Sequence, residues 1–155
     1  MNDFRKVFWK QITEMADKDD KIRVLVGDLG WSFFDEFKEK HPDKFINCGI
    51  MEQGMIGIAS GMALGGLKPY VYSGSVFILT RPYEQIRDDI CYNNLDVKLI
   101  GTGASGFLGF THNFEGKENE KDLLKNLPNL NVKFPKNEKE LKQAIQVKGA
   151  TYIRI

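Results

Sequence analysis

Short runs of β-branched and aliphatic residues alternate with amphipathic segments along the whole chain. The runs that we expect to form strands are residues 21–28, 44–50, 68–74, 97–102, 131–135 and 151–155. The segments in which apolar residues recur at helical spacing are residues 4–15, 31–43, 52–64, 83–93, 117–128 and 137–146. Strands that alternate with helices predict a mostly parallel sheet with helices on both faces. We therefore expect a three-layer α/β/α fold with a sheet of about six strands.

The length and charge of the chain limit its possible functions. A chain of 155 residues without repeats or an evident linker favours a single domain, residues 1–155. Its 22 basic and 21 acidic residues give a net charge of +1, which predicts neither a nucleic-acid partner nor a membrane surface. No apolar run reaches membrane-spanning length, and the N-terminus lacks the pattern of a signal peptide. With two cysteines in apolar runs and no metal-ligand spacing, we expect reduced thiols and a cytoplasmic location.

Four segments that follow expected strands carry polar residues and glycines. They are Asp28, the turn at residues 49–52, the segment 73–81 and the loop 101–112. In an open parallel sheet, ligands bind beyond the carboxyl ends of the strands. We therefore expect these four segments to meet at one edge of the sheet and to form the site.

One of these segments matches a dinucleotide-binding pattern. Gly101, Gly103 and Gly106 fit G-x-G-x-x-G after a strand. That motif requires a helix that opens at the third glycine, so that its amide groups meet the pyrophosphate. The residues that follow have no helical period, and the strand is the fourth of the chain rather than the first. We interpret the segment as a flexible, glycine-rich loop.

Glu52 is the single carboxylate in the run "NCGIMEQGMIGIASGMALGG". An ionised carboxylate without a partner is costly in apolar surroundings, so such a group is neutralised or shares a hydrogen bond. Two interpretations follow. As a first-turn acid, Glu52 would complement the dipole of the helix it begins, with an effect of about 0.5 kcal/mol. As a partly buried acid that faces a ligand, it would suit proton exchange with a heteroaromatic nitrogen.

The residues around Glu52 resemble the transketolase family, specifically the pyrimidine-binding domain of thiamine-diphosphate enzymes. The resemblance covers roughly residues 5–155 and is closest to the C-terminal subunits of split transketolases, without their further domain. It rests on a turn, a glycine-rich helix, a strand, an aromatic segment and a helix in a fixed order. In this chain these are Gly49, Ile50, Glu52, Met55, Gly57–Gly66, Lys68, Pro69, Phe77, Ile86 and Arg87.

The resemblance implies a catalytic role for Glu52. In the family, the matching glutamate hydrogen-bonds N1′ of the coenzyme's aminopyrimidine and shifts the ring to its imino tautomer. That tautomer takes the proton from C2 of the thiazolium, and a two-carbon ketol unit then passes between sugars. The resemblance also implies an aromatic stack on the pyrimidine, which we assign to Phe77, with Ile78 or Tyr83 as neighbouring choices. Asp28 and Leu29 match a loop that lines the coenzyme.

The loop 101–112 departs from the family pattern. Thr111 and His112 match the Thr-His pair that contacts sugar hydroxyls, but Gly103 stands near an expected histidine and Leu108 near an expected aspartate. His112 is therefore a candidate catalytic and substrate-binding residue whose alternative is a structural loop histidine.

Two arginines are further substrate candidates. Arg154 resembles a family arginine that can hold a substrate phosphate, with an ion pair to a surface acid as the alternative explanation. Arg81 is a second candidate for anion binding.

The sequence lacks the G-D-G…N pattern of the family's Mg²⁺ and diphosphate site. The resemblance therefore implies that this chain binds no metal and needs a diphosphate-binding N-terminal subunit, which would hold Mg²⁺ and share the thiamine diphosphate. It also implies that the pyrimidine domains associate with each other. Three functions remain open: a transketolase subunit, a related component of deoxyxylulose-phosphate synthase or oxo-acid dehydrogenase type, and a non-catalytic module. We expect the substrate to be a sugar or a sugar phosphate.

Overall fold

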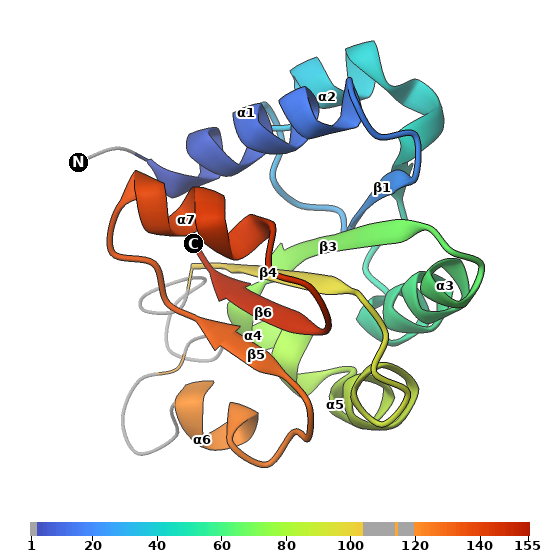
Figure 1. Cartoon of the computed structure of the whole chain (residues 1–155), viewed down its shortest axis with the longest axis vertical. Helices are drawn as coiled ribbons and strands as arrows, with labels where there is room; N and C mark the ends of the chain where they lie inside the picture. The colour runs from blue at the N-terminus through green and yellow to red at the C-terminus, as the bar shows by residue number, and fades with distance from the viewer. Residues whose placement is uncertain (1–2, 104–113, 115–119) are drawn as a thin grey trace.

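The computed structural model describes residues 3–103, 114 and 120–155 of the chain. A six-stranded sheet runs through its middle (Figure 1), and all its neighbouring strands are parallel. The strand order is β2-β1-β3-β4-β6-β5. The strands are β1 (Ile22–Val26), β2 (Phe45–Asn47), β3 (Lys68–Gly74), β4 (Lys98–Thr102), β5 (Asn131–Lys133) and β6 (Thr151–Arg154).

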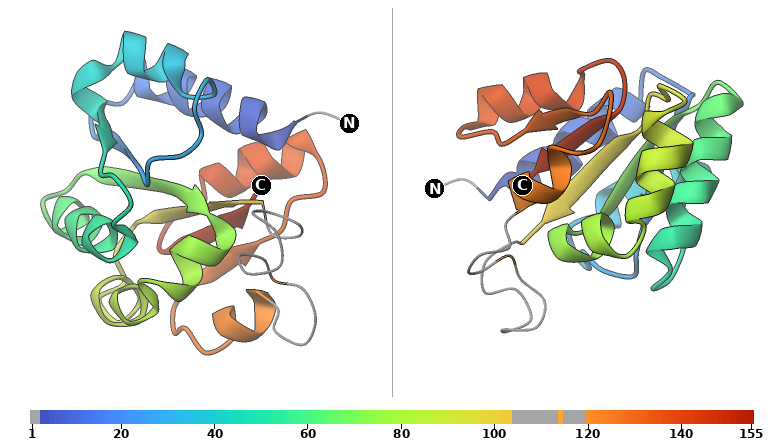
Figure 2. Two further views of the ribbon diagram at one scale, coloured as in Figure 1. Left: turned by 180° about the vertical axis from the view of Figure 1, so that it is seen from behind. Right: turned by 90° about the horizontal axis from the view of Figure 1, so that it is seen from below.

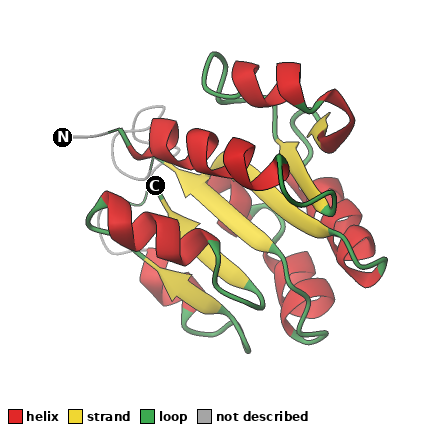
Figure 3. Cartoon of the chain, turned by 45° about the horizontal axis from the view of Figure 1, so that its top comes forward, coloured by secondary structure: helices red, strands yellow, loops and turns green. Residues whose placement is uncertain are grey.

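Helices cover both faces of this sheet. The α-helices are α1 (Phe4–Ala16), α2 (Asp35–Lys40), α3 (Glu52–Leu64), α4 (Ser75–Thr80), α5 (Tyr83–Gln85), α6 (Glu120–Leu124) and α7 (Glu138–Ile145). A 3₁₀ turn, η1 (Pro42–Lys44), and a π-helical segment, η2 (Ile86–Cys91), complete the elements. Figure 2 shows α1 and α7 on one side of the sheet and α3 and α5 on the other, and Figure 3 shows the same layers by element type. The three-layer α/β/α prediction is confirmed.

Each face of the sheet buries its own apolar cluster. On the face covered by α1, α2 and α7, Phe8, Trp9 and Tyr72 pack ring against ring, with centroid separations of 5.2 to 5.8 Å. On the other face, Met55 and Ile56 of α3 are fully buried against the sheet. Burial of side chains of this size contributes roughly 1.5–3 kcal/mol each. The strands are therefore covered on both faces, as a parallel sheet requires.

The segment 75–80 differs from its sequence pattern. Its residues Ser-Val-Phe-Ile-Leu-Thr have no evident helical period, yet they form α4. Gly74 ends β3 and is the N-cap of α4, in which Ile78 and Leu79 are fully buried in the second cluster. Tertiary burial therefore decides the conformation here, against a local propensity for extended structure.

The order in which successive strands are added to the sheet reverses at β1 and β3. From β1 the chain first moves outward to β2, then returns across β1 to form β3 on its other side. In sheets of this kind, ligands bind outside the carboxyl ends of the strands at this point. Residue 27 after β1, the turn after β2 and the end of β3 all lie there. In the described part of the chain, no helix is long and apolar enough to cross a membrane.

Candidate active site

Asn47, at the end of β2, ties together two loops that follow strands. Its side-chain oxygen accepts hydrogen bonds from the backbone N–H groups of Asp28 (3.2 Å) and Gly49 (3.0 Å). Its amide nitrogen donates to the Asp28 carboxylate at 3.0 Å. Gly49 adopts φ = 72°, in the left-handed region that glycine tolerates without strain. The turn that leads into α3 is thereby fixed relative to the end of β1.

That turn places Glu52 as the first residue of α3, with only 2% of the residue exposed. The hydroxyl of Ser73, on β3, donates to Oε1 of Glu52 at 3.0 Å. The guanidinium of Arg81 donates to Oε2 at 2.7 Å. Both carboxylate oxygens therefore have partners, which is the condition for keeping a charge in a buried position. Glu52 also lies in the first turn of α3, where a negative charge complements the helix dipole.

The absence of a side chain at Gly27 allows this arrangement. A Cβ atom at residue 27 would lie 3.2 Å from Oγ of Ser73 and 3.4 Å from Oε1 of Glu52. A side chain at residue 27 would crowd both groups, so glycine at this position favours the close approach of β1 to the carboxylate.

Phe77 and Arg81 form the neighbouring wall. The guanidinium carbon of Arg81 lies 4.0 Å from the centroid of the Phe77 ring, which is a cation–π contact. Phe77 is mostly buried, whereas the Arg81 side chain is 37% exposed. One arginine thus covers the aromatic ring and pairs with the buried acid at the same time.

An open hollow lies beside Glu52 and Arg81. It is lined by Ile50, Met51, Glu52, Gln53, Gly54 and Arg81. Ile50 and Met51 are 73% and 45% exposed, so an apolar rim faces solvent beside a buried carboxylate. A flat, partly polar ligand would find here an apolar edge and a hydrogen-bond acceptor, if the contact with Arg81 were exchanged.

The other predicted coenzyme-binding residues do not line this hollow. Asp28 is exposed and bonded to Asn47, and Leu29 is half-buried against the α1 side of the core. Ile78 is fully buried in the cluster beneath α3, so its side chain does not face the hollow. The hydroxyl of Tyr83 donates to the backbone oxygen of residue 123 at 3.1 Å, which directs it toward α6. Phe77 is thus linked to Glu52 through Arg81, which contacts both, and the coenzyme-binding roles of all these residues stay predictions.

Arg154 lies apart from Glu52, on β6. Its guanidinium pairs with Glu120, the first residue of α6, at 2.8 Å, and Glu120 also accepts a hydrogen bond from the hydroxyl of Tyr152. The structure thus shows the ion pair that the alternative expected, but the acid is buried rather than at the surface. Phosphate binding by Arg154 stays a prediction. Thr111 and His112 lie outside the described residues, as do Gly106 and Leu108.

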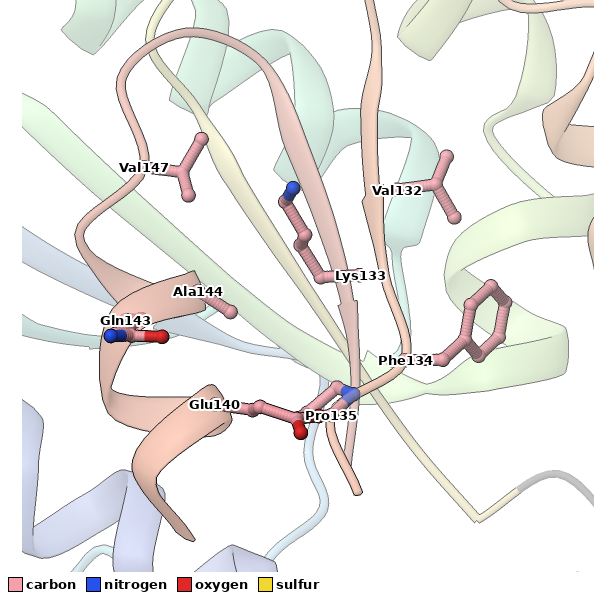
Figure 4. Close-up of a pocket in the computed structure, with 8 residues that line it drawn as sticks. All are labelled: Val132, Lys133, Phe134, Pro135, Glu140, Gln143, Ala144 and Val147. Atoms are coloured by element: carbon pink, nitrogen blue, oxygen red, sulfur yellow. The ribbon is translucent and has the colours of Figure 1, made fainter. Parts of the chain in front are cut away.

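A second hollow lies between β5 and α7 (Figure 4). It is lined by Val132, Lys133, Phe134, Pro135, Glu140, Gln143, Ala144 and Val147. Its acid, Glu140, accepts from the backbone N–H of residue 136 and from the side chain of Asn137, and its own N–H donates back to Asn137. These are the reciprocal bonds of a helix cap. The carboxylate of this hollow is thus used to begin α7.

Sequence reasoning missed three residues of the Glu52 site: Gly27, Asn47 and Ser73. Each lies at or just beyond the end of a strand, so their common signal is position at the carboxyl edge of the sheet. The sequence also indicated Arg81 as a candidate for anion binding, but not that the anion is the Glu52 carboxylate. In the described part of the chain, no group of three or more His, Cys, Asp or Glu side chains could hold a metal ion.

The family model "Transketolase, pyrimidine binding domain" matches residues 1–152. The chain belongs to this family. A subunit of the apulose-4-phosphate transketolase of Actinobacillus succinogenes is 33% identical over 143 residues, which are 88% of this chain and 45% of that protein. The 1-deoxy-D-xylulose-5-phosphate synthase of Halothermothrix orenii is 35% identical over 150 residues, which are 92% of this chain and 22% of that protein. This transketolase-type domain thus spans less than half the length of these curated relatives.

A solved structure shares the fold of this transketolase-type domain. It is described as "Split gene transketolase, inactive beta4 tetramer", and it superposes with a TM-score of 0.83 at 33% sequence identity. The match covers 97% of this chain and 50% of that one. The resemblance found in the sequence is therefore confirmed, both for the family and for its fold.

Proposed function

We propose that this chain is a subunit of a thiamine-diphosphate-dependent transketolase-like enzyme and that Glu52 activates the coenzyme's aminopyrimidine. One observation carries the proposal: a buried carboxylate at the start of α3 has one oxygen held by Ser73 and the other held by Arg81, and both Glu52 and Arg81 line a hollow. The second oxygen, Oε2, is placed to accept a hydrogen bond from a ligand that enters the hollow.

The residues around the hollow fit a planar heteroaromatic ring. Glu52 would hold the proton at the ring nitrogen N1′, and burial strengthens that hydrogen bond because the local dielectric is low. Phe77 would lie against the ring, with a contribution of about 1 kcal/mol beyond area burial. Gly27 leaves room for the close approach. When bound, the coenzyme would supply the electron sink for cleavage of a carbon–carbon bond, which no side chain here provides.

A partner subunit belongs to this proposal. The relative from Actinobacillus succinogenes is named as one subunit of a transketolase, and the solved neighbour is called an inactive tetramer of beta chains. We infer that the present chain is inactive alone, associates with itself and needs an N-terminal subunit that binds the diphosphate and Mg²⁺. Apolar side chains on and before α3 support such contacts, because Ile50, Met51, Ile58 and Leu64 are all exposed.

A second candidate is a related synthase or an oxo-acid dehydrogenase component. The relative from Halothermothrix orenii, a 1-deoxy-D-xylulose-5-phosphate synthase, is as similar as the transketolase subunit and favours this candidate. Both functions would use the same Glu52 chemistry and would differ in substrate. His112, Arg154 and Arg81 are our candidates for contacts with that substrate, which we expect to be a sugar or a sugar phosphate in the transketolase case.

The decisive experiment compares Glu52→Gln and Glu52→Ala with wild type in a complex that contains the diphosphate-binding subunit. We expect either variant to lower the rate of ketol transfer by a factor of about 100 or more, the magnitude of a lost proton-transfer group. Glu84→Gln, which changes an acid of α5 that lies outside the hollow, is the matched control and should leave the rate unchanged. Full activity in Glu52→Ala would exclude the catalytic role.

The substrate is then assigned with a panel of free and phosphorylated ketoses and of 2-oxo acids. Turnover of ketose donors with aldose acceptors supports the transketolase, and turnover of a 2-oxo acid supports the second candidate. A wild-type complex that binds the coenzyme and turns over no member of the panel would indicate a non-catalytic module.

A further inference from the structure

Both side chains assigned to the coenzyme ring are already in contact with a residue of the chain itself. Arg81 donates to Oε2 of Glu52 at 2.7 Å, and its guanidinium lies 4.0 Å from the centroid of the Phe77 ring. The other oxygen, Oε1, is bonded to Ser73, and both Glu52 and Arg81 line the hollow. Arg81 therefore makes the two contacts that the proposed function gives to the aminopyrimidine.

A guanidinium suits this role on chemical grounds. It is planar and carries N–H donors in its plane, so it can stack on an aromatic face while it bonds a carboxylate. An aminopyrimidine that shares a proton with a carboxylate presents the same combination of a flat face and an N–H donor. Two such groups cannot lie on Phe77 and bond Oε2 simultaneously.

We propose that Arg81 is a built-in placeholder: it fills the pyrimidine site in the free chain and is displaced when the coenzyme binds. The proposal rests on the proposed function, because the displacing ligand is the coenzyme ring. It assigns Arg81 a regulatory role at this site that is separate from the chemistry of Glu52.

The structure allows this exchange without a change in the backbone. The N–H of Arg81 is bonded to the backbone oxygen of Phe77, so α4 fixes the position of residue 81. Its side chain is 37% exposed, and the guanidinium can leave by rotation into solvent. Glu52 need not move, because Ser73 continues to hold its other oxygen.

The exchange has two consequences. In the free chain, Arg81 keeps the buried Glu52 charge paired, so its removal destabilises that state. For the coenzyme, the site is open only in the fraction of molecules in which Arg81 has left, and the apparent affinity is reduced by that fraction. A chain without its partner subunit would thus resist adventitious ligands at Glu52.

The first experiment is a double-mutant cycle in the free chain with Arg81→Met, Glu52→Gln and both changes together, measured by thermal denaturation. We expect Arg81→Met to lower Tm by about 5 °C when residue 52 is Glu and by less than about 2 °C when it is Gln. Arg87→Met is the matched control, because Arg87 pairs with exposed Asp88 at 2.8 Å rather than with a buried acid. If Arg81→Met lowered Tm equally with Glu and with Gln at position 52, the ion pair would not be a stabilising contact.

The second experiment measures the Kd of thiamine diphosphate with Mg²⁺ by calorimetry in the complex with the diphosphate-binding subunit. We expect Arg81→Met to bind about tenfold more tightly than wild type, with Arg87→Met unchanged. If Arg81→Met bound the coenzyme no more tightly than wild type, while wild type bound it normally, Arg81 would not be a placeholder. The proposed function would remain intact. If none of these complexes bound thiamine diphosphate, both the proposed function and the displacement of Arg81 would be contradicted.

Discussion

Two buried glutamates in this molecule have nearly the same partners. Glu52 begins α3 and Glu120 begins α6, and each pairs with an arginine, at 2.7 and 2.8 Å. Each also accepts a hydrogen bond from a hydroxyl on a strand, which is Ser73 for Glu52 and Tyr152 for Glu120. We call the first group the α3 triad (Glu52, Ser73 and Arg81) and the second the α6 triad (Glu120, Tyr152 and Arg154).

The two triads differ in whether a member is free to leave. In the α6 triad, Tyr152 is fully buried, and both it and Arg154 belong to β6, so the sheet holds them in place. In the α3 triad, Arg81 follows the short helix α4 and extends over the edge of a hollow. A buried acid and its cation thus stabilise the fold when regular structure fixes both of them. They become a candidate ligand site when the cation can be exchanged.

The largest effect that separates the triads concerns stability. Glu120→Ala would leave Arg154 without its anion and the buried Tyr152 hydroxyl without its acceptor, and we expect the free chain to lose about 3 kcal/mol. Glu52→Ala should cost less in the free chain, because the partly exposed Arg81 can return to water. Urea denaturation of both variants measures the difference.

Glu120→Gln is the matched control for this measurement. It retains an acceptor for Tyr152, and should lose less stability than Glu120→Ala. If Glu52→Ala proved the more destabilising of the two alanine variants, the distinction between a fixed and an exchangeable triad would be wrong.

The fold was predictable because its signals are local and repeated. Each strand of the sheet coincides with a short apolar run, and α3 begins and ends where its glycine-rich pattern does, at Glu52 and Leu64. The exception is α4, where burial of Ile78 and Leu79 outweighs a local sequence that has no helical period.

The site was predictable only in part, because its polar contacts join residues that are distant in sequence. Glu52 stood out as a lone acid in an apolar run, but its partners lie 21 and 29 positions away. Nothing in the local pattern at Ser73 or Arg81 indicates which acid they meet. The same holds for Arg154 and Glu120, which are 34 positions apart.

A smaller effect concerns the glycines next to each triad. A Cβ at Gly101 would lie 2.3 Å from the Tyr152 hydroxyl and 2.9 Å from Oγ of Ser75, so Gly101→Ala must displace buried groups, and we expect a loss of about 2 kcal/mol. At Gly27 the nearest side-chain atom would be 3.2 Å away, and Gly27→Ala should cost less than about 1 kcal/mol.

Gly61→Ala provides the control for these two variants. It lies in the interior of α3, a Cβ there would contact nothing within 4 Å, and the change should stabilise the free chain by up to about 1 kcal/mol. If Gly101→Ala lost less unfolding free energy than Gly27→Ala, the side chains around the α6 triad would shift more easily than their burial suggests.

The smallest effect distinguishes the triads by pH. Burial, and then the charge of Glu120, raise the pKa of Tyr152 well above its usual value of 10.0, whereas Ser73 in the α3 triad does not titrate. The folded state thus favours the protonated phenol. Its contribution to stability is complete below pH 10 and is lost as the pH rises through the range above it, at up to about 1.4 kcal/mol per pH unit.

Tyr152→Phe should therefore reduce the fall in unfolding free energy between pH 9 and pH 11, although it lowers stability at pH 8 through the lost hydrogen bond. Tyr92→Phe, at an exposed position, should leave that fall unchanged. If Tyr152→Phe became as sensitive to alkali as wild type, the phenol would not be the group that fixes the α6 triad.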